Sequence, residues 1–134
     1  MWTKKSFTLI EMVIVLIIVT ILAALAWHNY SGLKEKALDR EAKTSLALIQ
    51  VAERNYRMEH GYYYPSSDRE TNIANINSNL KLSLLVISPK WTITLDTRTA
   101  GSEFATAARS GRTWTIYFSK TSSEVPSCTG TGCS

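Results

Sequence analysis

The chain has 134 residues, which is room for one domain. Charged residues make up 19% of it, below the usual quarter, and the formal net charge is +4. Lys4 and Lys5 supply two of these charges, so the rest of the chain is only mildly basic. No stripe of lysine and arginine interleaved with aromatic residues is present, which argues against nucleic acid as a partner.

An apolar segment, residues 7–27, follows the basic start of the chain. As a helix it would be about 30 Å long, which matches the hydrocarbon core of a membrane. Its one strongly polar side chain is Glu11. Because Lys4 and Lys5 precede the segment, we expect them to stay in the cytoplasm and the rest of the chain to lie on the outer side.

Three interpretations of this segment compete. It could be a secretory signal peptide cut after Ala26, a signal anchor that stays in the membrane, or a signal cut before the apolar run. A carboxylate in the middle of a membrane helix costs about 2.5–3.5 kcal/mol, and nothing in a secretory signal requires Glu11. If the chain began at Phe7, a free amine would lie one helical turn from Glu11, which favours the third interpretation.

The segment Lys4-Lys5-Ser6, followed by Phe7-Thr8-Leu9-Ile10-Glu11 and an apolar helix, resembles the N-terminal signature of type IV pilins and the related pseudopilins. The resemblance implies that residues 1–6 are a leader, cut between Ser6 and Phe7 by a prepilin peptidase that also methylates the Phe7 amine. It also implies that Glu11 neutralises the Phe7 amine of a neighbouring subunit during assembly. The chain departs from the family pattern, which has glycine before the cut, glycine in mid-span and proline just beyond it; here Ser6, Thr20 and His28 stand at those positions.

The helix is predicted to continue outside the membrane to His60, with Gly61 ending it, and no proline interrupts residues 7–64. The periodicity of residues 30–60 predicts one apolar helix face, made of Leu38, Ala42, Ser45, Ile49, Ala52 and Tyr56. Leu46 and Leu48 are expected to broaden this face. Charged residues are expected opposite, with the favourable pairs Asp39–Lys43 and Glu53–Arg57.

Residues 61–83 are predicted to be a loop, with room for a short helix, and the sheet and C-terminal loop follow in residues 84–134. In residues 91–96 and 113–119 apolar and polar side chains alternate, which predicts two strands. Residues 104–109 are predicted to form a weaker strand, and residues 84–88 are a candidate fourth strand. Ser110-Gly111-Arg112 is a hairpin turn signal. The apolar sides of the strands require a helix as cover. We therefore expect an α+β fold, the ladle of a pilin, in which a long N-terminal helix packs on a small antiparallel sheet.

The tail carries Cys128 and Cys133, whose spacing between glycines and threonines favours a disulfide in an oxidising compartment over two free thiols. The histidines, His28 and His60, are far apart and no second cysteine pair exists, so no metal site is expected. No catalytic constellation and no cofactor motif are found, which indicates a protein that is not an enzyme.

The predicted function is therefore structural. Residues 7–29 would anchor the precursor in the bacterial inner membrane and later form the filament core, and residues 30–134 would form the globular domain. The resemblance implies a homo-oligomeric, extracellular type IV pilus filament, with the inner-membrane assembly machinery as a further partner. The alternatives are a pseudopilin of a type II secretion system and a secreted soluble domain cleaved after Ala26.

Overall fold

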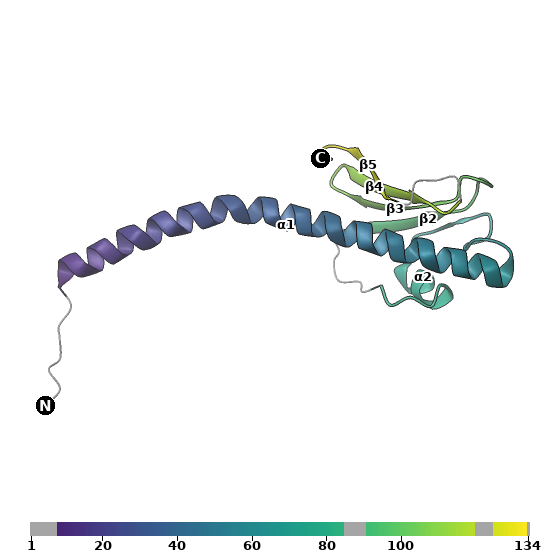
Figure 1. Cartoon of the computed structure of the whole chain (residues 1–134), viewed down its shortest axis with the longest axis horizontal. Coiled ribbons are helices and arrows are strands. Elements are labelled where there is room, and N and C mark those ends of the chain that lie inside the picture. Colours follow the sequence, from purple (N-terminus) through teal and green to yellow (C-terminus); the bar gives the residue numbers. More distant parts are fainter. Residues whose placement is uncertain (1–7, 85–90, 120–124, 134) are drawn as a thin grey trace, which may run out of the picture. The chain divides into compact units, whose positions relative to one another are not determined.

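The computed structural model describes residues 8–84, 91–119 and 125–133, and the chain divides into two compact units, Met1–Leu38 and Asp39–Ser134. The sequence analysis placed the boundary after residue 29, where the apolar segment ends. The structural boundary lies after Leu38 because it separates groups of residues that contact one another. Helix α1 (Leu9–His60) runs through both units, so the predicted continuous helix is confirmed over the described residues (Figure 1). It ends at Gly61, which has a φ of +85° and donates its N–H to the carbonyl oxygen of Arg57 at 2.8 Å.

The first unit contains the apolar part of α1. Residues Leu9–Ala26 have a mean hydropathy of 3.0, and none of them is buried against other parts of the chain. This stretch is long and apolar enough to cross a membrane.

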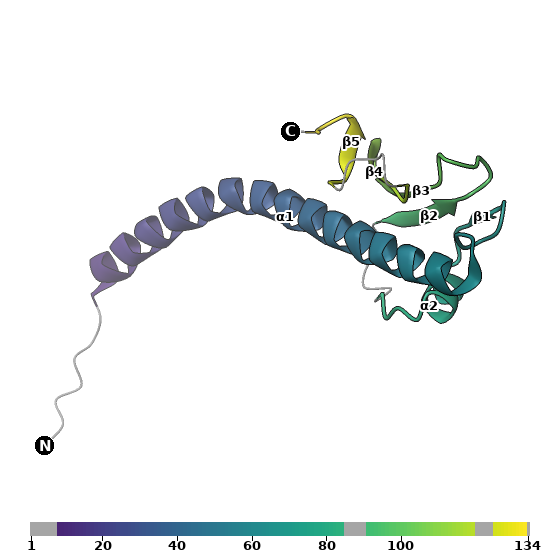
Figure 2. The same ribbon diagram turned by 45° about the vertical axis from the view of Figure 1, so that its right-hand side comes forward.

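The second unit is built on a sheet. The described residues form five antiparallel strands in the order β1 (Arg69–Glu70), β2 (Thr92–Asp96), β3 (Phe104–Arg109), β4 (Arg112–Tyr117) and β5 (Ser127–Gly130). The predicted hairpin between β3 and β4 is present, but its loop is Ser110-Gly111 alone, since Arg112 already belongs to β4. Ser110 and Gly111 both have positive φ, as the favoured tight hairpin turn requires. The sheet lies on one side of residues 39–60 of α1, and helix α2 (Ile73–Asn79) lies on another (Figures 1 and 2).

The core lies between these three elements. Its centre is Leu46 and Ile49 of α1, Ile76 of α2, and side chains of the inner sheet face: Leu95, Ala105, Ala107, Trp114, Ile116 and Phe118. Each fully buried aliphatic side chain contributes about 1.5–3 kcal/mol relative to an exposed one. Leu95, Trp114, Ile116 and Phe118 are buried, which confirms the apolar sides predicted for residues 91–96 and 113–119 at these positions.

Two assignments on the predicted α1 face are wrong. Leu48 is 50% exposed, because it lies two residues and about 200° from Leu46 around the helix. Glu53, predicted to be on the solvent side, is fully buried, because it lies four residues after Ile49 on the same face. The sheet and α2 together cover a wider face than the periodicity indicated.

The charged pairs predicted along α1 are also wrong. Asp39 contacts Arg112 of β4, and Glu53 accepts the backbone N–H of Tyr64, in place of the helical pairs. The predicted loop 61–83 contains both β1 and α2, and the predicted C-terminal loop contains β5. Within the candidate strand 84–88, Leu84 is buried and residues 85–88 lie outside the described residues.

Candidate functional site

The start of α1 is built around Thr8 and Glu11. The backbone N–H of Glu11 lies 3.1 Å from the carbonyl oxygen of Thr8 and 3.4 Å from its hydroxyl oxygen. Thr-x-x-Glu is the capping-box pattern, in which the threonine hydroxyl accepts the N–H of the third helical residue. The Thr-x-x-Glu spacing is thus a local sequence signal for the cap that Thr8 provides to the backbone N–H of Glu11.

The Glu11 carboxylate is exposed in the first turn of an apolar helix. A negative charge there is stabilised by the helix dipole, by about 0.3–1 kcal/mol. Its neighbours Ile10 and Met12 are exposed apolar side chains, so the carboxylate is an acceptor available to a cation on another molecule. Ser6 and Phe7 lie outside the described residues, so the cleavage, the methylation and the Phe7–Glu11 contact stay predictions.

The second polar group of the apolar segment is satisfied within the helix. The hydroxyl of Thr20 donates to the carbonyl oxygen of Leu16 at 2.6 Å. A hydroxyl bonded in this way does not need a partner in lipid or in a neighbouring helix. Glu11 is therefore the group in this segment whose chemistry calls for an external partner.

In the second unit, the predicted disulfide is present. Cys128 on β5 and Cys133 are bonded, with their Cα atoms 5.8 Å apart. Cys128 lies opposite Trp114 in the register of β4 and β5 and packs against the core. The tail is therefore attached to the sheet through backbone pairing as well as through the bridge.

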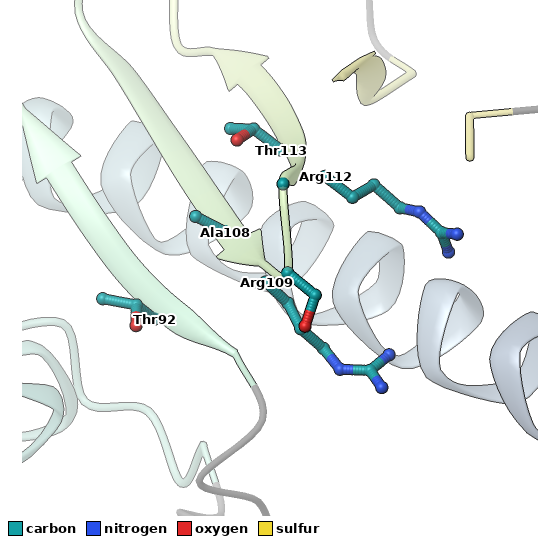
Figure 3. A pocket seen from close by; sticks show the side chains of 7 residues that line it. Thr92, Ala108, Arg109, Arg112 and Thr113 are labelled. Carbon is teal, nitrogen blue, oxygen red and sulfur yellow. The ribbon is translucent and has the colours of Figure 1, made fainter. Parts of the chain in front are cut away.

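A hollow of about 530 Å³ lies at the β3–β4 turn, lined by Thr92, Ala108, Arg109, Ser110, Gly111, Arg112 and Thr113. Figure 3 shows the Arg109 and Arg112 side chains extending in the same direction from the two sides of the turn. The guanidinium of Arg112 contacts the Asp39 carboxylate at 2.7 Å, and that of Arg109 lies 5.8 Å from the centre of the Trp91 ring. Both cations of the hollow are thus engaged within the chain.

Glu53 is a fully buried ionisable group of this unit. Its Oε2 accepts the N–H of Tyr64 at 2.9 Å, while its Oε1 is buried without a hydrogen-bond partner. Burial raises the pKa of Glu53 to about 8, against the opposing effect of the Tyr64 hydrogen bond. The carboxyl group is therefore mostly protonated at neutral pH, which removes the cost of a buried charge.

Two further carboxylates, near the β1 edge of the sheet, have lowered pKa values. The side chain of Arg98 donates to Asp96 and is the main cause of the low pKa of that carboxyl group. The backbone N–H of Asn72 and the side-chain amide of Asn75 donate to Glu70 and lower its pKa. Both groups stabilise loop structure as anions. Across residues 8–84, 91–119 and 125–133, no cluster of three or more His, Cys, Asp or Glu could hold a metal ion.

The start of the chain matches a known family model. Residues 3–27 match the family model of the prokaryotic N-terminal methylation motif. This match covers Ser6, Phe7 and Glu11, the residues to which the sequence analysis gave roles in cleavage and assembly. The predicted resemblance to pilins and pseudopilins is therefore confirmed at the level of this motif.

Curated relatives include both classes. The type II secretion system core protein G of Escherichia coli (strain K12) is 30% identical over 66 residues, which are 49% of this chain and 45% of that protein. The type IV major pilin protein PilA of Myxococcus xanthus (strain DK1622) is 37% identical over 60 residues, which are 45% of this chain and 27% of that protein. The aligned part is thus less than half of either relative. No solved structure matches the chain.

Proposed function

We propose that this chain, which carries the prokaryotic N-terminal methylation motif on a pilin-like α+β fold, is a structural subunit of a type IV pilus filament. In this proposal the precursor is held in the bacterial inner membrane by its apolar helix. After removal of the leader, the same helix leaves the lipid and packs against other copies in an extracellular filament.

The observation that supports this proposal most strongly is the combination of Glu11 with an apolar helix that nothing in the described chain covers. Lipid tails are as apolar as leucine, so helices in a membrane associate through packing and polar contacts rather than through the hydrophobic effect. A carboxylate buried among packed helices would cost several kcal/mol without a partner. The Phe7 amine of a neighbouring subunit would remove this cost and set the axial position of that subunit.

A pseudopilin of a type II secretion system is the second candidate. The similarity to core protein G of Escherichia coli favours it, and its N-terminal chemistry would be the same. The two candidates differ in the structure that the subunits form. A pilus subunit should be recovered in long filaments sheared from the cell surface, whereas a pseudopilin should stay with the cell envelope at normal expression.

The first test is the processed N-terminus. We expect intact-mass and fragmentation analysis of the protein recovered from membranes containing a prepilin peptidase to find a chain that begins with singly N-methylated Phe7. Ser6→Gly restores the residue usual in the family and should be processed at least as completely. A chain beginning at Trp27, or a full-length chain in the presence of an active peptidase, would contradict the proposal.

A further inference from the structure

The ion pair between Asp39 and Arg112 joins α1 to β4. Nη1 of Arg112 lies 2.7 Å from Oδ1 and 2.8 Å from Oδ2 of Asp39, and Nε1 of Trp114 lies 3.4 Å from Oδ1. The two charged side chains are only 16% and 19% exposed. A pair that is shielded in this way is screened less by salt than a surface pair and depends more on geometry.

The tail loop, residues 128–133, covers this pair. Gly130 lies opposite Arg112 in the register of β4 and β5, and the N–H of Thr131 donates to the carbonyl oxygen of Gly111 at 3.2 Å. A Cβ atom added to Gly132 would lie 2.5 Å from Nη2 of Arg112 and 3.4 Å from its Cζ. The loop backbone thus lies directly against the guanidinium, and a side chain at position 132 would displace it and would also be strained by the φ of +80°.

The disulfide holds the loop in this place. Cys128 is paired with Trp114 on the sheet, and Cys133 directly follows Gly132, so the bridge ties the free end of the loop back to β5. Closing such a loop lowers the conformational entropy of its open states.

We propose that the Cys128–Cys133 loop is a redox-sensitive clasp that positions Arg112 on Asp39, so that the attachment of α1 to this edge of the sheet depends on the disulfide. A dithiol reductant would open the clasp by thiol–disulfide exchange: the S–S bond breaks, Cys128 and Cys133 each gain a proton, and the reductant becomes a disulfide. Gly132 is then no longer held against Arg112, and the ion pair weakens. The inference is independent of the proposed function.

The test measures how strongly Asp39 is coupled to the loop. The full chain in detergent micelles is unfolded with denaturant, with the disulfide closed or after reduction by dithiothreitol and blocking of the thiols. With the disulfide closed, Asp39→Asn should lower the folding equilibrium constant about fivefold or more, the usual scale for coupled contacts. After reduction the same substitution should have little effect.

Asp96→Asn is the control for reduction. Its partner Arg98 belongs to the opposite side of the sheet, beyond β2, so the fold-change that this substitution causes should be the same in both redox forms. An equal effect of Asp39→Asn in the closed and reduced forms would overturn the proposal.

A second arm needs no reduction. Gly132→Ala and Gly101→Ala place alanine at nearly the same strained φ, +80° and +83°, but only the Cβ at Gly132 meets Arg112, since nothing lies within 4 Å of the one at Gly101. With the disulfide intact, Gly132→Ala should abolish the fold-change caused by Asp39→Asn, and Gly101→Ala should preserve it. If the Gly132→Ala chain keeps the full effect of Asp39→Asn, the loop does not position Arg112.

Discussion

Glu53 is a carboxyl group without access to water in the packed part of α1. Its pKa of about 8 lies above the ordinary 4.5 because burial disfavours the charged form. Between these two values the folded state holds a proton that the unfolded state has released. Stability therefore falls as the pH rises through this window, at a rate that approaches about 1.4 kcal/mol per pH unit for one such proton.

Glu53→Gln should remove this pH dependence. Glutamine keeps an oxygen for the Tyr64 N–H and cannot ionise, so the variant should gain stability over the wild type as the pH rises from about 5 to about 8. Denaturant unfolding of the full chain across this pH range measures the effect. Glu59→Gln is the matched control, since that side chain is 57% exposed, and it should keep the slope of the wild type. Parallel slopes for wild type and Glu53→Gln would contradict the high pKa.

The sequence could not place Glu53. A glutamate within a helix is normally on the solvent side. The pattern of residues 38–56 does not determine how wide the buried face of the helix is. The sheet and α2 cover a wide face of α1, and this face includes the position of Glu53. Tyr64 supplies the N–H that makes the burial tolerable, and it comes from a segment whose path local pattern does not predict.

At the scale of elements, α1 is held in the second unit by a few buried side chains. Leu46 of α1 is fully buried in the core that α1 forms with the sheet and α2, while Leu48, two residues later, is half exposed. The two residues have the same chemistry and the same helix propensity, and they differ in what surrounds them.

Leu46→Ala should therefore destabilise the unit by about 2–5 kcal/mol, because it leaves a cavity in the core. Leu48→Ala removes the same atoms from a half-exposed position, and its effect should be clearly smaller. Denaturant unfolding followed by tryptophan fluorescence compares the two variants. Equal losses would show that the assignment of the buried face of α1 is incorrect.

Strands β2, β3 and β4 were predicted to within two residues at each end, because their alternation and their hairpin turn are local signals. Strands β1 and β5 were missed. β1 has two residues, and β5 has four that are mostly small, so neither offers enough alternation to be recognised. Both add to sheet edges through backbone pairing, which depends on the rest of the fold.

For the whole molecule, the exposed apolar surface of Leu9–Ala26 is the feature that demands a partner. An exposed apolar surface of this length is unfavourable in water, so it must lie in lipid or among other apolar helices. A chain that uses both environments in turn has the physical properties of a filament subunit with a membrane-held precursor. The motif from Phe7 to Glu11 predicted this from sequence, but the contact itself needs a second copy.

We propose that Glu11 acts through its charge on a neighbouring subunit. Glu11→Gln separates this role from helix capping, because glutamine at the third helical position still completes a capping box. Thr20→Val is the control for polarity, since it removes a hydroxyl that is satisfied within its own helix. Mass analysis of Phe7 in each variant separates a failure of assembly from a failure of processing.

The most direct measurement is electron microscopy of filaments from cells that produce these variants together with the assembly machinery. We expect long filaments for the wild type and Thr20→Val, and few or none for Glu11→Gln even when its Phe7 end is correctly processed. Glu11→Gln filaments of normal number, length and helical symmetry would contradict it.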